Sequence, residues 1–93
     1  MIINFDCKET KKVFNGEFSK NLPHYIQGIA KRKLDMIHNA MNENDLRVPP
    51  SNHYEKLIGN LKDFRSIKIN DQFRIIFKYE NNNAYSVKID DYH

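Results

Sequence analysis

Three polar side chains that could take part in chemistry stand side by side in the sequence: Asp91, Tyr92 and His93. Each type can form hydrogen bonds, and an imidazole is the only one of the three that ordinarily titrates near neutral pH. Together they could bind a substrate, orient it or exchange protons with it. A histidine at a chain end is, however, more often a frayed residue without a role. Position alone does not decide between these alternatives.

The sequence contains no local catalytic signature. It has no glycine-rich phosphate loop, no His-Glu-x-x-His helix, no nucleophile elbow and no acidic cluster suited to two metal ions. Cys7 is the single cysteine, which excludes an intrachain disulfide and a cysteine-rich zinc site. We therefore expect no metal and no cofactor. If the protein cleaves RNA, the RNA 2′-hydroxyl would be the nucleophile, and the protein would supply a proton acceptor, a proton donor and positive charge.

The segments that must position these groups alternate between apolar and polar residues, as strands with one buried face do. Residues 64–70, 73–80 and 84–90 show this pattern, and turn-forming residues between them predict an antiparallel meander. The side chains expected to pack on helices are Ile67, Ile69, Phe73, Ile75, Phe77, Tyr79, Tyr85, Val87 and Ile89. The opposite face would hold Ser66, Lys68, Arg74, Ile76, Lys78, Ser86, Lys88 and Asp90. Four cations with one carboxylate on an open surface favour an anion-binding face, and a phosphodiester backbone is the obvious candidate.

Two helices are expected before the strands. The first covers residues 6–15, with Asp6 as its N-cap in a capping box with Glu9, and Asn15-Gly16 ends it. The second covers residues 22–44, where apolar side chains recur every three or four positions.

Details of the second helix complete the predicted architecture. Pro23 fits its first turn, Met41 belongs to its apolar face, and the basic triplet 31–33 is expected mostly to face water. Prolines at 49 and 50 then break the helical pattern inside one domain that spans residues 1–93. Helices followed by a series of hairpins predict an α+β fold.

Composition bounds the class of protein. The 93 residues carry a formal net charge of +3 and have a pI of about 9.0, which is compatible with a polyanionic partner but does not require one. No apolar stretch approaches the length of a membrane span, and the opening residues do not resemble a signal peptide. We therefore expect a cytoplasmic protein without a membrane partner.

Four histidines are available for chemistry. His24 and His38 fall within the longer predicted helix and are weak candidates. His53 follows the proline break and could reach the open sheet face, although a solvated loop position is the commoner situation for such a histidine.

The strand pair and the final tripeptide together resemble one known family. Residues 66–77, Ser-Ile-Lys-Ile-Asn-Asp-Gln-Phe-Arg-Ile-Ile-Phe, followed by the terminal Asp-Tyr-His, closely resemble the HigB/GraT-type toxins of the RelE/ParE superfamily. Residues 46–52 and 57–60 are similar to the connector and the Leu-x-Gly segment of that family, and residues 2–13 fit its opening. The resemblance covers the whole chain and favours a functional tripeptide over a frayed end.

The resemblance implies a fold and a set of partners. The fold would be RelE-like, with two N-terminal helices packed on a twisted, mainly antiparallel sheet. The protein would be a ribosome-dependent mRNA endonuclease (an mRNA interferase) that cuts translated message in the decoding site and inhibits translation. A HigA-like helix-turn-helix antitoxin would neutralise it in a hetero-oligomer and repress the operon, so the toxin would meet operator DNA only through the antitoxin.

The resemblance also implies roles for individual residues. Arg74 would stabilise the scissile phosphate, Asp91 and Tyr92 would orient the substrate, and His93 would take part in proton transfer. The division of proton-transfer roles between Tyr92 and His93 stays open. Residues expected to bind RNA are His53, Lys56, Lys68, Lys78 and Lys88.

One departure from the family pattern affects the expected activity. Some members carry a histidine and a lysine just before the glycine of the Leu-x-Gly segment, where Glu55 and Ile58 stand in an ungapped alignment anchored on Gly59. Lys56 or His53 could replace them from nearby. Loss of one charge-assisted contact to a transition state costs on the order of 3–4 kcal/mol, about a hundredfold or more in rate. A mild toxin is therefore expected.

Two alternatives to the nuclease do not require cleavage. The chain could act by protein binding, as ParE relatives act on gyrase, or it could survive as an inert corepressor bound to its antitoxin. Arg74 together with a terminal histidine favours the nuclease, because ParE-type chains do not usually end in this way.

Overall fold

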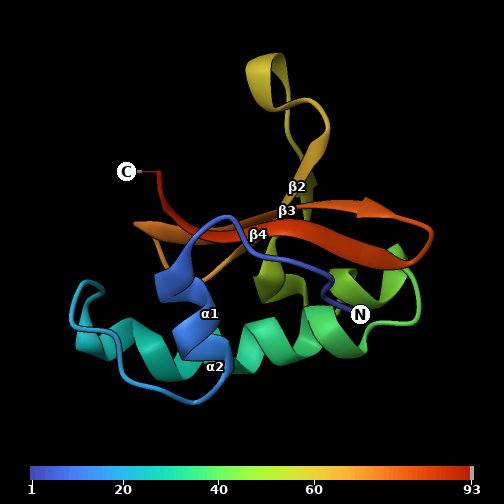
Figure 1. Ribbon diagram of the computed structural model, residues 1–93. Coiled ribbons are helices and arrows are strands. Elements are labelled where there is room, and N and C mark those ends of the chain that lie inside the picture. Colours follow the sequence, from blue (N-terminus) through green and yellow to red (C-terminus); the bar gives the residue numbers. More distant parts are fainter. Residues whose placement is uncertain (93) are drawn as a thin grey trace.

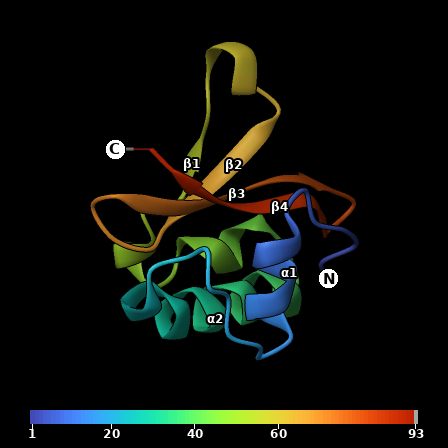
Figure 2. The same ribbon diagram turned by 60° about the vertical axis from the view of Figure 1, so that its left-hand side comes forward.

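The computed structural model describes residues 1–92, which form a helix layer and a sheet layer (Figures 1 and 2). Within these residues the main elements are α1 (Lys8–Phe14), α2 (His24–Asn39), β1 (Glu55–Lys56), β2 (Phe64–Lys68), β3 (Phe73–Glu80) and β4 (Asn83–Asp91). The strands form an antiparallel sheet in sequence order. Both helices lie against one face, while the β1–β2 hairpin projects from the other side (Figure 2). The predicted α+β fold with two N-terminal helices is confirmed.

The apolar core lies between α2 and the sheet, as the spacing of apolar residues predicts. Ile26, Ala30, Leu34 and Ile37 of α2 are fully buried, and so are Ile67, Ile75, Phe77 and Val87 of the sheet. Truncation of a buried leucine or isoleucine to alanine usually costs about 2–5 kcal/mol, so these side chains account for much of the stability of the layered arrangement.

Helix α2 is shorter than the predicted segment 22–44. It ends at Asn39, and Met41, expected on its apolar face, is 77% exposed. Local side-chain bonds compete with the helix beyond this point. The Asn42 side chain accepts a hydrogen bond from the Asn44 amide, and the Asp45 carboxylate accepts one from the Met41 amide. The chain therefore turns into a short 3₁₀ helix, Glu43–Arg47.

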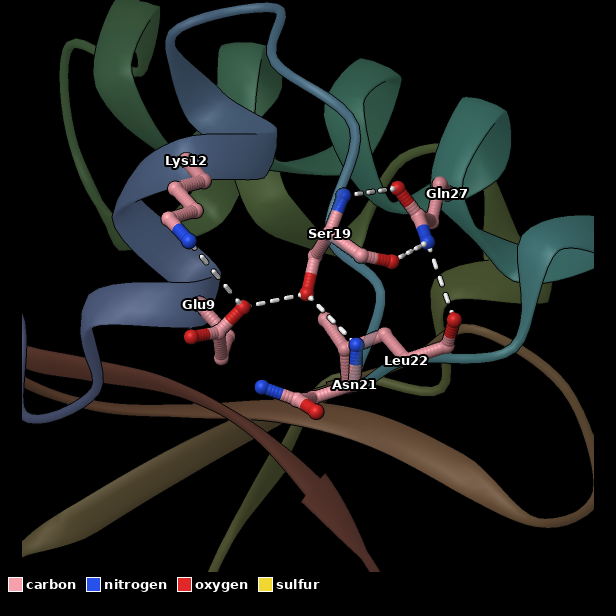
Figure 3. Close-up of polar contacts among 6 residues, drawn as sticks. All are labelled: Glu9, Lys12, Ser19, Asn21, Leu22 and Gln27. Atoms are coloured by element: carbon pink, nitrogen blue, oxygen red, sulfur yellow. Dashed lines mark hydrogen bonds and ion pairs between the residues drawn. The ribbon is translucent and has the colours of Figure 1, made fainter.

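The predicted capping box of α1 is wrong. The N-cap is Cys7, without a side-chain cap bond, while the Asp6 amide donates to the carbonyl of Val87 in β4. Glu9 is turned toward the α1–α2 loop, where it accepts a hydrogen bond from the Ser19 hydroxyl (Figure 3). That bond lowers the pKa of Glu9. The predicted helix end is confirmed, since Asn15 is the C-cap.

The α1–α2 loop is held to both helices by the buried Ser19 (Figure 3). The Ser19 amide donates to the Gln27 side chain at 3.0 Å, and Gln27 donates back to the Ser19 carbonyl at 2.7 Å and to the Leu22 carbonyl at 3.0 Å. This network fixes α1 relative to α2. The Thr10 hydroxyl, which accepts the Ile89 amide at 2.9 Å, then ties α1 to the sheet.

The predicted side-chain alternation is confirmed in β2 and β3 but fails near the start of β4. Lys78 pairs with Tyr85 and Tyr79 pairs with Ala84, whereas Ile76 pairs with Lys88, so one extra residue of β4 bulges between these rungs. Paired residues lie on the same face of a sheet. Tyr85 therefore lies on the uncovered face with Lys78, and fully buried Ala84 faces the helices in its place.

Candidate functional site

A cleft of about 320 Å³ opens on the uncovered face, and its lining comes from β2, β3, the end of β4 and the chain that leads into β1. Its lining residues are His53, Glu55, Ser66, Lys68, Arg74 and Tyr92. All six side chains can form hydrogen bonds, and four of them belong to residue types that can carry a charge. The cleft therefore offers an open polar surface rather than an enclosed small-molecule pocket.

Arg74 is fixed in this cleft from two sides. Its Nε atom donates to the Asp90 carboxylate at 3.0 Å, and its guanidinium carbon lies 4.8 Å from the centre of the Tyr92 ring. The ion pair uses Nε, so it does not occupy the two terminal nitrogens of the guanidinium. A guanidinium oriented in this way presents a planar donor fork, which suits a phosphate.

Lys68 adds a second cation. Its ammonium group lies 3.0 Å from the carboxylate of Asp71, and this bond raises the pKa of Lys68. Because Lys68 and Arg74 are cross-strand partners, their side chains leave the sheet on the same face. The pair therefore places two cations, each held by a carboxylate, on the uncovered face beside the β2–β3 turn.

The β2–β3 turn also holds the tail that follows β4. The Tyr92 amide donates to the Gln72 carbonyl at 3.0 Å, and the Tyr92 hydroxyl donates to the Asn70 carbonyl at 3.1 Å. The Gln72 side-chain amide donates to Asp91 at 3.1 Å. Asn70 in turn accepts the amides of Gln72 and Phe73 through its side chain, at 2.8 and 2.7 Å. The turn motif and the tail motif are therefore one connected unit.

His53 enters the cleft because the residue before it is anchored. Asn52 is fully buried, accepts a 2.7 Å hydrogen bond from the Lys33 ammonium and donates to the carbonyls of Leu46 and Val48. His53 itself has a left-handed backbone (φ 45°), which turns the chain toward β1.

The position of Lys33 differs from what the sequence predicts for the basic triplet 31–33. Its triplet was expected mostly to face water, and Arg32 does so, but Lys33 is only 6% exposed. Burial lowers the pKa of Lys33, and the charge of the neighbouring Arg32 lowers it further. The buried lysine therefore serves as a hydrogen-bond donor inside the fold.

Several residues expected at the site stand outside the cleft. Lys78 and Lys88 are exposed on the uncovered face but do not line it. Lys56 pairs with Arg65 and hence shares the helix-facing side with Phe77, away from Glu55. Asp91 pairs with Phe73 and also leaves β4 on the side opposite Arg74. His93 lies outside the described residues.

Two lining residues, Glu55 and Ser66, were not singled out as site residues from the sequence. Ser66 fell on the correct face by alternation, but nothing marked it as part of a cleft. Glu55 could not be assigned to a face, because β1 has only two residues and no alternation can be read from it. The signal for Glu55 is its register opposite Ser66, which only the folded sheet provides.

No helix among the described residues is long and apolar enough to cross a membrane. Within residues 1–92, no group of three or more His, Cys, Asp or Glu side chains is arranged to hold a metal ion.

Comparison with known proteins identifies the family. A sequence model of RelE-like HigB toxins of type II toxin-antitoxin systems matches residues 3–93. An uncharacterized protein of Haemophilus influenzae is 41% identical over 75 residues, which cover 81% of this chain and 74% of that protein. Toxin HigB-1 of Vibrio cholerae is 39% identical over 91 residues, which cover 97% of this chain and 96% of the toxin. The chain therefore belongs to the HigB family of RelE-like toxins of type II toxin-antitoxin systems.

Proposed function

We propose that this toxin is a ribosome-dependent mRNA endonuclease that inhibits translation and works without a metal ion. The observation that carries the proposal is the cleft in which Arg74, Lys68 and Tyr92 meet His53 and Glu55. Cations and groups that exchange protons are what cleavage of RNA by its own 2′-hydroxyl requires of a protein.

In the proposed reaction the 2′-oxygen of one nucleotide attacks the adjacent phosphorus, and the bond to the 5′-oxygen of the next nucleotide breaks. The products are a 2′,3′-cyclic phosphate and a 5′-hydroxyl end. Arg74 and Lys68 would stabilise the negative charge that develops on the phosphorus oxygens. His53, Glu55 and, by motif position, His93 would take the proton of the 2′-hydroxyl and return one to the leaving oxygen.

The tail would contribute in two ways. The Tyr92 ring, which lies against Arg74, would hold the guanidinium and orient the substrate. Asp91 would act as a positioning residue, since it bonds Gln72 on the far side of the strand from Arg74. Lys78, Lys88 and Lys56 would bind RNA away from the reacting phosphate.

A type II toxin has an antitoxin as its partner. We propose that this partner is a HigA-like helix-turn-helix protein that forms a hetero-oligomer with the toxin and links it to operator DNA. The proposal implies a cytoplasmic protein, because the ribosome and its message are the target. A mild activity is expected, because Glu55 replaces the histidine of some relatives and Ile58, which replaces their lysine, is 89% exposed in the β1–β2 loop.

The test uses translating ribosomes with a defined message and the purified toxin. The wild-type protein should produce discrete cleavage products, and Arg74→Ala should reduce the cleavage rate by about a hundredfold or more. Arg32→Ala, which removes an exposed arginine from the helix layer, should cleave like the wild type. Intact message combined with inhibition of gyrase would overturn the proposal in favour of a ParE-like toxin. Intact message with no effect of toxin expression on growth would favour an inert corepressor.

A further inference from the structure

A row of three side chains crosses the uncovered face at some distance from the cleft. Phe64 of β2 pairs with Lys78 of β3, and Lys78 pairs with Tyr85 of β4. Cross-strand partners share a face, so the Lys78 side chain leaves the sheet between Phe64 and Tyr85, on the side that no helix covers (Figures 1 and 2). Lys78 is exposed and both rings are half-buried.

The bulge in β4 is what brings Tyr85 to this face. Ser86 has a left-handed backbone (φ 55°), which is uncommon for a residue with a side chain and needs support from its surroundings. Asn4 supplies that support, because its side-chain oxygen accepts the Ser86 amide at 2.6 Å and its carbonyl accepts the Val87 amide at 3.2 Å. The aromatic ring is thus held on the uncovered face by the N-terminal segment.

The position of Lys78 is also defined. Its ammonium lies 5.3 Å from the centre of the Phe64 ring, in the range of a cation–π contact. A cleft of about 410 Å³ borders this lysine and contains three cations and two carboxylates: Lys62, Arg65, Lys78, Asp63 and Glu80, together with Tyr79. Arg65 lies 3.6 Å from Glu43 and belongs to the helix-facing side, so the exposed Lys78 is the cation that we assign to a backbone phosphate.

We propose that Tyr85 and Lys78 form a second RNA subsite, in which an unpaired base stacks on the tyrosine ring and a neighbouring phosphate binds the lysine. Aromatic rings next to cations are the usual means by which proteins bind single strands, because every base has a face that can stack. Phe64 would act as a positioning residue that orients Lys78. This subsite rests on the proposed function to the extent that the substrate is unpaired RNA.

The proposed subsite and the cleft lie along the same strand, β3. Lys78 is four positions further along β3 than Arg74, which is about 13 Å at the usual rise of a strand. That span corresponds to about four stacked nucleotides, or to fewer in an extended strand. The intervening rung pairs Ile76 with Lys88, so a third cation lies between the two sites. One strand of RNA could follow this line from the cleft to Tyr85.

The chain has no tryptophan, which allows a direct test of stacking. Tyr85→Trp places a single fluorescent indole at the subsite, and Tyr25→Trp places one at an exposed position of α2 as a matched control. The probe is an unstructured 2′-O-methyl RNA of about ten nucleotides, within the usual range of single-strand sites, which resists cleavage. We expect saturable quenching for Tyr85→Trp and none for Tyr25→Trp. Equal quenching in the two variants would overturn the proposal.

The affinity of the protein for the same RNA gives a second measurement of the role of the Tyr85 ring. Tyr85→Ala should weaken binding of the same RNA about tenfold, while Tyr85→Phe should bind like the wild type, because the stacking face is retained. Thermal melts of the variants verify that they remain folded. Equal affinity of folded Tyr85→Ala and wild type would contradict the subsite. So would quenching by a duplex of the same sequence as strong as that by the single strand, since paired bases cannot stack on the ring.

These results are distinguishable from failure of the proposed function. Quenching by single-stranded RNA without any cleavage on ribosomes would retain the subsite and reject the endonuclease. Cleavage on ribosomes without quenching, and with an unchanged affinity for Tyr85→Ala, would retain the endonuclease and reject the subsite.

Discussion

The hydroxyl of Tyr92 donates a hydrogen bond to the backbone carbonyl of Asn70, 3.1 Å away. This bond joins two segments that are 22 residues apart in the sequence, the β2–β3 turn and the tail after β4. It brings Tyr92 into direct contact with the Asn-Asp-Gln turn. The turn therefore binds the tail and holds the Tyr92 ring against Arg74.

Substitutions of Tyr92 should separate the role of its ring from that of its hydroxyl. Tyr92→Phe keeps the ring against Arg74 and loses only the bond to Asn70, worth about 1 kcal/mol. RNA cleavage should therefore fall by less than about tenfold in Tyr92→Phe. It should fall further in Tyr92→Ala, which also loses the cation–π contact. Single-turnover cleavage on ribosomes measures both rates. An equal, large loss in the two variants would instead show that the hydroxyl itself exchanges protons with the RNA.

Removal of the Asn70 side chain should destabilise the β2–β3 turn and its contact with the tail. Asn70→Ala leaves the amides of Gln72 and Phe73 without their acceptor, and we expect a loss of about 1–3 kcal/mol in the free energy of unfolding. Cleavage should fall as well, because the tail is held by this turn. Urea denaturation measures the first effect, with Asn60→Ala in the exposed β1–β2 loop as the control. Stability and cleavage equal to those of the control would refute the role of the Asn70 side chain in holding the turn and the tail.

Glu43 should make folding sensitive to acid. It accepts a 2.7 Å hydrogen bond from Tyr54, which lowers the pKa of Glu43 below its ordinary 4.5, and Arg65 lies 3.6 Å from the same carboxylate. A carboxyl whose pKa is lowered by folding stabilises the protein above its ordinary pKa, and that contribution is lost as the pH falls through 4.5 and below.

Tyr54→Phe tests this contribution. The variant should lose about 1–2 kcal/mol of unfolding free energy at neutral pH. The difference from the wild type should shrink in acid, where Glu43 is protonated in both proteins. Urea denaturation across the acidic range measures it, and Tyr25→Phe on the exposed side of α2 is the control. A difference that is independent of pH would contradict the assignment to Glu43.

The buried Lys33 should add a second rise of stability with pH, in the alkaline range. Its pKa is lower in the folded chain than its ordinary 10.5, so the unfolded chain binds more protons between the two values. Stability should therefore rise with pH in that interval, relative to a variant without the amine. Lys33→Met should lack this rise, while Lys31→Met, whose lysine is 39% exposed, should retain it. Parallel stability curves for wild type and Lys33→Met would contradict the prediction.

The arrangement of β2 and β3 could be predicted because nothing interrupts their alternation, and Lys68 and Arg74 therefore fell on the correct face. The prediction failed for Tyr85, because the bulge that moves it depends on Asn4, 82 residues from Ser86. It failed for Lys33 because its partner Asn52 belongs to another element. Alternation describes a regular strand or helix, and contacts between distant segments are not encoded in it.

The candidate site was predictable to a similar extent. Arg74, Lys68, Tyr92 and His53 were named from the sequence and line one cleft. Lys78 and Lys88 share the face but not the cleft, because the rungs of a sheet separate residues that alternation treats as equivalent. Asp91 follows Asp90 directly, and consecutive side chains of a strand point in opposite directions.

The N-terminal segment has a consequence for the solubility of the fold. Its amides and carbonyls pair in parallel with β4, through Ile3 to Ala84 at 2.8 Å and Asp6 to Val87 at 3.0 Å. At the other edge of the sheet, β1 offers only two residues. A long strand with free backbone groups is a template on which further chains assemble edge to edge. Because the N-terminal segment covers one edge and the strand at the other edge is short, we expect the uncovered face to remain accessible without edge-to-edge pairing between copies of the protein.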